Sequence, residues 1–336
     1  MVRSLSPMEA MTALFDMTED DPELDLVEYE LTRLDPTGDR VATVLRDTFD
    51  QLYDGQHTGR WNFDDLHKTE KTHMGTLVEI NLHREFNFAD GDVTDYRIAG
   101  VQVDCKYSSY PFGWNLPPEV VGQLALLLHA SESKLTWHAG ILRIRPEYLR
   151  IGQTRDSKKE LLASARSNIR WLWTGHKRLP PNLFYQLDAE TRDAIFNAKA
   201  RRGNQHGQAR VNELFRRVQG RIVRRAELAT VAQQDDFMKR ARGNRGSRTA
   251  LRAEGILVLG QQDSDPVIAR ALGLPLPRKG ELVAARVVPA DSNRTDPVAV
   301  INGCAWAIAR PGDEVVTAPI VDRKKAPTNS IQGRLI

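Results

Sequence analysis

The sequence predicts a two-domain protein of the α/β (α+β) class, in which a mixed domain is followed by a mainly helical domain with β structure at its end. At 336 residues the chain is long enough for two domains of ordinary size. Helix and strand patterns alternate over the first half. The double proline Pro180-Pro181 then interrupts the pattern. We therefore place residues 1–174 in the first domain, 175–182 in a linker and 183–336 in the second domain.

The first domain is expected to begin with helices. Ser6-Pro7-Met8-Glu9 is a typical helix start, with proline in the first turn. Leu45, Phe49 and Leu52 share the spacing of one helix face. Apolar residues at the same spacing predict another helix over 66–84.

Strand patterns follow this helix. Val93–Ala99 and Val101–Tyr107 alternate around Gly100, which predicts two short strands or one bent hairpin. Trp137–Ile144 is a further predicted strand.

Two more helices are expected in the first domain. Pro117-Pro118 predicts the start of one that runs through Leu124–Leu128. The basic segment 155–174 is expected to close the domain as the other. Helix, strands, helix and strand in this order indicate an α/β core.

The second domain combines short helices with a hairpin. Three helices are predicted, at Ala209–Val218, Arg224–Gln233 and, longer and basic, Asp235–Ala253. The last contains a glycine-rich interruption at Gly243–Gly246, and the whole has the spacing of a helix-turn-helix. Asn302-Gly303, between Val298–Ile301 and Cys304–Ile308, is a strong hairpin signal. Helices followed by β structure indicate a winged-helix domain.

Several classes of protein are excluded by composition. No run of about 18 apolar residues appears, which excludes a membrane span. The first residues lack the apolar stretch of a signal peptide, so we expect a cytoplasmic protein. Cys105 and Cys304 lie far apart, with no CxxC or Cys/His cluster beside either. A metal here would be held by oxygen ligands.

The net charge of +3 hides an uneven distribution. Residues 143–253 hold 26 Lys+Arg against 10 Asp+Glu, a net of +16, whereas the remaining residues hold 21 against 34, a net of −13. Such asymmetry is typical of proteins with nucleic-acid partners. Solvated helix faces give a similar pattern, so a second signal is needed.

That signal comes from the predicted strand Val101–Tyr107. Because side chains alternate across a strand, Asp104 and Lys106 share one face and Cys105 lies on the other, where only its carbonyl would reach a metal. A hairpin would bring Asp95 near Asp104. Two carboxylates can hold Mg²⁺, and a lysine can orient water or neutralise developing charge. Two carboxylates and a lysine in this arrangement suit phosphodiester hydrolysis. The alternative interpretation is that they form an ordinary surface ion pair.

Asp95…Asp104-x-Lys106 matches the PD-(D/E)xK nuclease motif, with Thr94 where many relatives have proline. Together with Lys68–Ile80 and Ile98–Lys106, the motif resembles the NaeI-like type II (type IIE) restriction endonucleases over most of the chain. This resemblance implies a restriction-endonuclease-like core, a C-terminal helix-turn-helix (CAP-like) domain and Mg²⁺ as cofactor. It implies the catalytic residues Glu79, Asp95, Asp104 and Lys106. The expected metal ligands are Glu79, Asp95, Asp104 and the backbone carbonyl of Cys105.

The resemblance also implies partners and a biological role. The expected protein is a homodimer that belongs to a restriction-modification system and binds two DNA duplexes. One duplex is cut, and the other acts as an allosteric effector in the second domain. If specificity follows the resemblance, the site is GCCGGC. An N-terminal extension has no assigned role.

Candidate DNA contacts lie in both domains. Residues of the basic third helix would contact phosphates or, for one or two, guanine edges: Lys239, Arg240, Arg242, Arg245, Arg248 and Arg252. Ser108 and Ser109 follow the predicted catalytic strand and would lie near the cut DNA strand.

Three alternatives stay open from the sequence. The protein could be a winged-helix DNA-binding regulator without catalysis, or another PD-(D/E)xK nuclease that repairs DNA or resolves junctions. His73 and His83 flank Glu79, so a His/Glu/His metal site is also conceivable, although the spacing is not HExxH.

Overall fold

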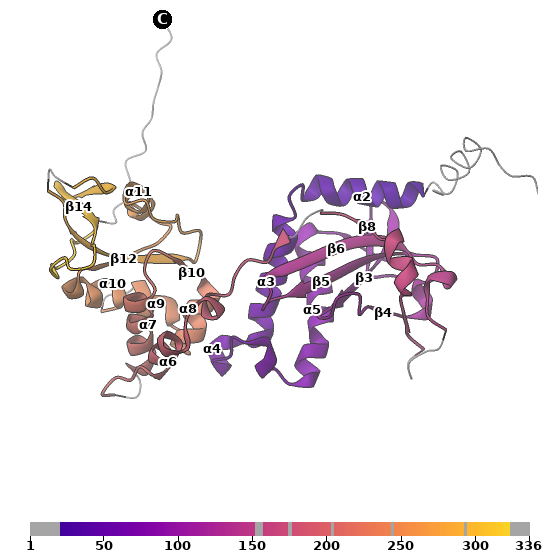
Figure 1. The fold of residues 1–336 in the computed structure, drawn as a ribbon, viewed down its shortest axis with the longest axis horizontal. Helices are drawn as coiled ribbons and strands as arrows, with labels where there is room; N and C mark the ends of the chain where they lie inside the picture. Colours follow the sequence, from indigo (N-terminus) through magenta and orange to yellow (C-terminus); the bar gives the residue numbers. More distant parts are fainter. Residues whose placement is uncertain are drawn as a thin grey trace, which may run out of the picture. The chain divides into compact units, whose positions relative to one another are not determined.

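The structure is a computed structural model that describes residues 21–151, 157–173, 177–202, 205–242, 245–291 and 294–322 (Figure 1). The predicted helix start at Ser6–Glu9 lies outside these residues. The chain forms two compact units: an N-terminal unit (Met1–Phe49 and His67–Pro181) and a C-terminal unit (Asp50–Leu66 and Asn182–Ile336). Residues 50–66 thus belong to the C-terminal unit, although the sequence analysis placed them in the first domain. Within the described ranges, no helix combines the length and apolar character needed to cross a membrane.

A mixed sheet forms the centre of the N-terminal unit. Its order, among the described residues, is β1-β2-β3-β5-β6-β8, and β9 also pairs with β6. The strands are β1 (Ala89–Asp90), β2 (Tyr96–Ile98), β3 (Val101–Ser108), β5 (Leu124–Ser131), β6 (Thr136–Arg143), β8 (Arg170–Trp171) and β9 (Lys177–Arg178). β3 and β5 are parallel and the other pairs are antiparallel. The predicted α/β class is confirmed.

Helices accompany this sheet. They are α2 (Pro22–Leu34), α3 (Asp39–Tyr53), which continues into the C-terminal unit, and α5 (Lys68–Phe86). The last confirms the helix predicted over 66–84. α5 buries Met74, Val78 and Leu82 and packs against β3 (Figure 1). The Glu70 carboxylate accepts from the His67 backbone N–H at 2.8 Å, so a side chain satisfies one of the free donors at its start.

The helix predicted through Leu124–Leu128 is wrong, because these residues form β5. Pro118–Val120 is only a short 3₁₀ helix. The residues from Leu124 to Leu128 are all apolar and all buried, so this part of the strand is apolar on both faces. Periodicity cannot distinguish such a run from a buried helix.

The closing helix predicted over 155–174 is also wrong. Its described part contains β7 (Lys159–Glu160), a 3₁₀ helix at Ala163–Asn168 and β8. β7 pairs with β4 (Asn115–Leu116). Leu161, Ala165 and Ile169 have helical spacing and are buried, but they cover one face of the sheet from an irregular segment. Pairing of β8 with β6 uses backbone groups that a helix would need internally.

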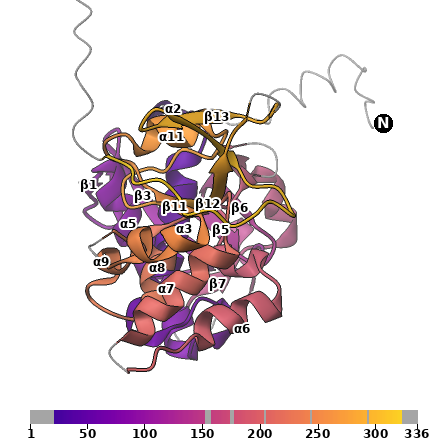
Figure 2. The ribbon, with the colours of Figure 1, turned by 90° about the vertical axis from the view of Figure 1, so that its left-hand side faces the viewer.

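The C-terminal unit contains short helices and a second sheet. The helices are α4 (Gly55–Thr58), α6 (Ala189–Asn197), α7 (His206–Arg217), α8 (Arg225–Ala232), α9 (Phe237–Arg242), α10 (Ser247–Ala250) and α11 (Asp265–Ala271). The strands are β10 (Ile222–Val223), β11 (Ile256–Leu259), β12 (Leu282–Pro289), β13 (Val298–Ile301) and β14 (Cys304–Ile308). β10, β11 and β14 all pair with β12, and β13 pairs with β14. Within this unit, α7, α8 and α9 lie on one side of β12 and α11 on the other (Figures 1 and 2).

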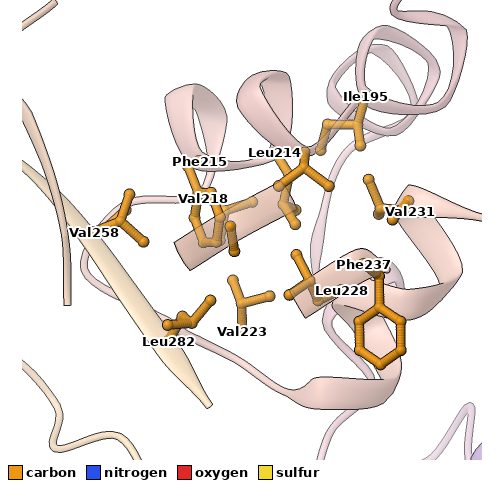
Figure 3. Close-up of a cluster of buried hydrophobic side chains, with 14 of the residues drawn as sticks. Ile195, Leu214, Phe215, Val218, Val223, Leu228, Val231, Phe237, Val258 and Leu282 are labelled. Atoms are coloured by element: carbon orange, nitrogen blue, oxygen red, sulfur yellow. The ribbon is translucent and has the colours of Figure 1, made fainter. Parts of the chain in front are cut away.

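Alternation along the strands builds two apolar cores in this unit. Ile256 and Val258 of β11 point into the core formed by α7 and α8, which Figure 3 shows in close-up. Leu257 and Leu259 point into the other core, against Ile268 of α11. The sheet is therefore covered on both faces.

The long basic helix predicted over Asp235–Ala253 is shorter than expected. Its described residues form α9, α10 and a 3₁₀ helix at Leu251–Glu254. Gly246 has an extended backbone immediately before α10, which divides the segment. The predicted hairpin is confirmed, because Asn302 and Gly303 have φ of 51° and 80° between β13 and β14.

One ion pair of the N-terminal unit is fully buried. Arg46 of α3 pairs with Glu132, which follows β5, and their side chains are 1% and 2% exposed. Burying both charges costs free energy, which their mutual attraction must offset.

We expect Glu132→Ala to lower the free energy of unfolding by about 3–5 kcal/mol, because the buried Arg46 guanidinium would lose its ion pair with the Glu132 carboxylate. Urea unfolding followed by tryptophan fluorescence measures the loss. Glu30→Ala removes a partly exposed pair with Arg33 and is the matched control, with a much smaller expected effect. Equal losses in the two variants would contradict the importance of burial.

Candidate active site

The hairpin of β2 and β3 positions the candidate catalytic residues. Its turn residues, Ala99 and Gly100, have φ of 50° and 86°, as a tight two-residue hairpin turn requires. The register pairs Tyr96 with Val103. Asp95, one residue before β2, therefore lies opposite Asp104, as the sequence predicts.

Three of the predicted residues meet at this position. Lys106 Nζ lies 2.5 Å from Asp104 Oδ2 and 3.7 Å from Asp95 Oδ2. The same ammonium donates to the Cys105 carbonyl at 3.1 Å. Asp95 Oδ2 accepts the Cys105 backbone N–H at 2.6 Å, which fixes that carboxylate on the strand. One cationic nitrogen is thus surrounded by three oxygens.

Glu79 comes to the site from α5. Its side chain is half-buried, and the Tyr96 hydroxyl donates to its backbone carbonyl at 2.7 Å. Burial, together with the neighbouring Asp95 carboxylate, raises the pKa of Glu79. Lys106 acts in the opposite direction, so Glu79 shares the electrostatic environment of the cluster.

Burial also dominates the protonation of Asp104. It raises the pKa of Asp104 to about 6, although Lys106 acts to lower it. Burial acts to lower the pKa of Lys106, but the neighbouring Asp104 and Asp95 carboxylates together outweigh burial, so the pKa of the lysine is raised. The cluster therefore keeps a positive charge beside an acid that titrates near neutral pH.

The oxygen set suits a hard divalent cation. Asp95, Asp104 and the Cys105 carbonyl are the ligand types that Mg²⁺ prefers, and the Lys106 ammonium stands in for a cation among them. Over the described ranges, no three His, Cys, Asp or Glu side chains converge closely enough to hold a metal by themselves. The backbone carbonyl would therefore be needed as a ligand.

Two other expectations for this region have clear outcomes. Cys105 is buried with a free thiol, as expected for packing, and burial raises its pKa. The alternative His73/Glu79/His83 metal site is not formed within the described part of the chain, because no such cluster converges and His83 instead pairs with Asp90 at 3.1 Å.

The two serines after β3 differ in accessibility. Ser108 is buried, and its hydroxyl accepts the Tyr110 backbone N–H at 3.1 Å. Its carbonyl also lies 2.9 Å from His129 Nδ1. Ser108 therefore has local structural contacts instead of a free hydroxyl, whereas Ser109 is partly exposed.

The six basic candidates in the C-terminal unit divide into two groups. Arg248 pairs with the buried Asp265 at 2.5 Å, and Arg252 donates to the Ala318 carbonyl at 2.9 Å. Arg240 pairs with Asp236 at 3.0 Å. These three cations hold their own unit together.

Lys239, Arg242 and Arg245 form the second group. All three side chains are exposed on or next to α9. They are the members of the predicted set best placed to meet a polyanion.

Sequence reasoning did not single out Tyr96. The residue directly follows Asp95 and is fully buried, and its hydroxyl donates a hydrogen bond to the Glu79 backbone carbonyl. The available signal was an aromatic residue beside a candidate carboxylate, on the inward side of the predicted strand.

Comparisons with known proteins identify the family of this chain. A profile of the family described as "Restriction endonuclease NaeI" matches residues 25–317. A curated protein named "Type II restriction enzyme NaeI", from Lentzea aerocolonigenes, is 58% identical over 317 residues, which are 94% of this chain and 100% of that protein. These matches place the chain in the class of type II restriction enzymes, which are site-specific deoxyribonucleases. Within that class, the chain belongs to the NaeI restriction endonuclease family.

We expect Asp104 to make the metal-free protein less stable as pH rises. Its pKa in the folded protein, about 6, is above the ordinary value of 3.8, so the folded state binds the proton more tightly. The stability contributed by this proton is therefore full below pH 3.8 and is lost as pH rises through 6.

Asp104→Asn should remove this loss. In EDTA, urea unfolding should show the variant to be more stable than the wild type by about 3 kcal/mol at pH 7.5 and nearly equal to it near pH 4. A variant that is less stable at pH 7.5 would show that the ion pair with Lys106 outweighs burial.

Proposed function

We propose that this protein hydrolyses double-stranded DNA at a specific sequence in a Mg²⁺-dependent reaction. The proposed active site contains Glu79, Asp95, Asp104 and Lys106, in a PD-(D/E)xK arrangement. The observation that carries the proposal is the Lys106 ammonium among the oxygens of Asp95, Asp104 and Cys105. Family membership supports the substrate and the reaction class.

The residues have separate roles in this proposal. Asp95, Asp104 and the Cys105 carbonyl would hold Mg²⁺, with Glu79 as a further carboxylate. When bound, the ion supplies positive charge to the phosphate and makes water more acidic. Lys106 Nζ can then donate to the attacking water or to a phosphate oxygen, where negative charge develops. Glu79, with its raised pKa, is suited to accept a proton from water.

The C-terminal unit is proposed to be a winged-helix domain that binds effector DNA. Its order of helix, strand, helices and two strands runs through α7, β10, α8–α10, β11 and β12. β10 and β11 flank β12 on its two edges, which is the strand arrangement of a winged helix. We assign DNA contacts to the exposed Lys239, Arg242 and Arg245, and keep Ser109 as a candidate near the cut strand.

The wider organisation is proposed from the family resemblance. The endonuclease domain would comprise residues 1–49 and 67–174, and the effector domain residues 183–336 together with the segment 50–66. The segment 175–182 would link them and would contain β9 of the first sheet. The protein would act as a homodimer on two duplexes, with GCCGGC as the recognition sequence.

We expect purified protein with Mg²⁺ to cut plasmid DNA into discrete fragments, and EDTA to abolish cutting. Asp104→Ala should lower the single-turnover rate roughly 10²- to 10³-fold, because both a ligand oxygen and the partner of Lys106 are lost. Binding of DNA in EDTA should persist.

Asp92→Ala is the matched control, since Asp92 is an exposed carboxylate just before the same hairpin. Wild-type cutting by Asp104→Ala would disprove the assigned site. Gel retardation without any cutting by the wild type would favour a regulator, and cutting confined to branched DNA would favour a junction nuclease.

We expect Lys239→Ala and Arg242→Ala each to lower the slope of log affinity against log salt by about 1, because each would remove a phosphate contact. The measurement uses full-length Asp104→Ala protein in EDTA, so that no DNA is cut. Both variants, made in the active enzyme, should also weaken the stimulation of slow sites by an added duplex. Arg216→Ala is the control, because Arg216 pairs with Glu254 at 2.7 Å. Unchanged slopes and stimulation would contradict the proposed DNA surface.

A further inference from the structure

Tyr96 occupies a central place beside the proposed active site without being part of its chemistry. It follows Asp95 in the chain, is 0% exposed, and pairs with Val103 as the first residue of β2. Its hydroxyl donates to the Glu79 carbonyl of α5 at 2.7 Å. One side chain thus joins the helix that carries Glu79 to the strand that directly follows Asp95.

Aromatic packing fixes the ring of Tyr96 independently of its hydroxyl. Its centroid lies 5.2 Å from that of Phe88 and 5.8 Å from that of His83.

The hydrogen bond from Tyr96 is directional, whereas the apolar contacts of α5 are not. Val78 and Leu82 bury their side chains and hold the helix on the sheet, but hydrophobic packing is not directional. A hydrogen bond depends steeply on distance and angle, so it resists sliding or rotation of α5 along the hairpin. Such movement would displace Glu79 from Asp95 and Lys106.

We propose that Tyr96 is a positioning residue for cleavage, whose hydroxyl sets the place of Glu79 relative to Asp95 and Lys106. Tyr96 does not touch substrate or metal in this proposal, and it acts only through Glu79. The inference rests on the proposed function, because it requires Glu79 to take part in the reaction.

The test is a double-mutant cycle between Tyr96→Phe and Glu79→Gln. Tyr96→Phe keeps the packed ring and removes only the hydroxyl. In the otherwise wild-type protein it should lower kcat roughly 10- to 100-fold, as loss of a supporting hydrogen bond does at metal sites. The Kd for DNA in EDTA and the urea unfolding midpoint should change little. In the Glu79→Gln background, the same change should leave the rate almost unaffected.

Tyr107→Phe is the matched control. Tyr107 lies on β3 directly after Lys106, and its hydroxyl donates to the Ala130 carbonyl at 3.3 Å, so the variant loses a similar bond that does not reach Glu79. Its kcat should stay near that of the wild type. Amide hydrogen exchange gives a readout besides activity: Tyr96→Phe, but not Tyr107→Phe, should speed exchange in α5 around Glu79.

The outcomes separate this inference from the function it rests on. Equal losses from Tyr96→Phe in both backgrounds, or an equal loss from Tyr107→Phe, would overturn the positioning role. A wild-type rate for Tyr96→Phe, while Glu79→Gln and Asp104→Ala are strongly slowed, would overturn the positioning role and leave the proposed active site standing. Wild-type rates for Glu79→Gln and Asp104→Ala would instead reject the proposed site.

Discussion

The register of the β2–β3 hairpin is the constraint on which the proposed site depends. A slip of one residue would move every side chain of a strand to the opposite face. The turn at Ala99-Gly100 prevents this slip, and it sets Asp95 opposite Asp104. Lys106 lies two residues after Asp104 on β3, and its ammonium contacts the carboxylates of both Asp104 and Asp95. The geometry of the proposed site therefore depends on the conformation of a two-residue turn.

The cluster has a cost that the fold tolerates. Asp104 is buried, and burial raises its pKa to about 6, so the metal-free fold disfavours its charge. The Lys106 ammonium partly offsets this effect, because it stabilises the charged Asp104 carboxylate. Active sites often lower the stability of a protein, and the rest of the fold compensates for this loss. The Asp104 site, which is destabilising until an ion binds, follows this pattern. The buried apolar run of β5, next to β3, supplies the rigid support.

Local signals in the sequence predicted much of the fold and of the proposed site. The helix at α5, the hairpin around Gly100 and the turn at Asn302-Gly303 follow from spacing and turn chemistry, and the structure confirms them. β5 and the segment 155–174 were mispredicted because their form depends on pairing with distant strands. Charge counts could not show that Arg248 and Arg252 have partners within their own unit. Tyr96 was missed because its role requires α5 and β2 to meet.

A crystal structure of the protein with DNA and Mn²⁺ tests whether the β2–β3 hairpin binds a metal ion. An anomalous difference map locates the ion without reference to activity. We expect a peak bound by Asp95, Asp104 and the Cys105 carbonyl, with the Lys106 ammonium moved out of that position. A peak at other residues, or a well-ordered complex with Lys106 still between the two carboxylates and no ion beside them, would contradict it.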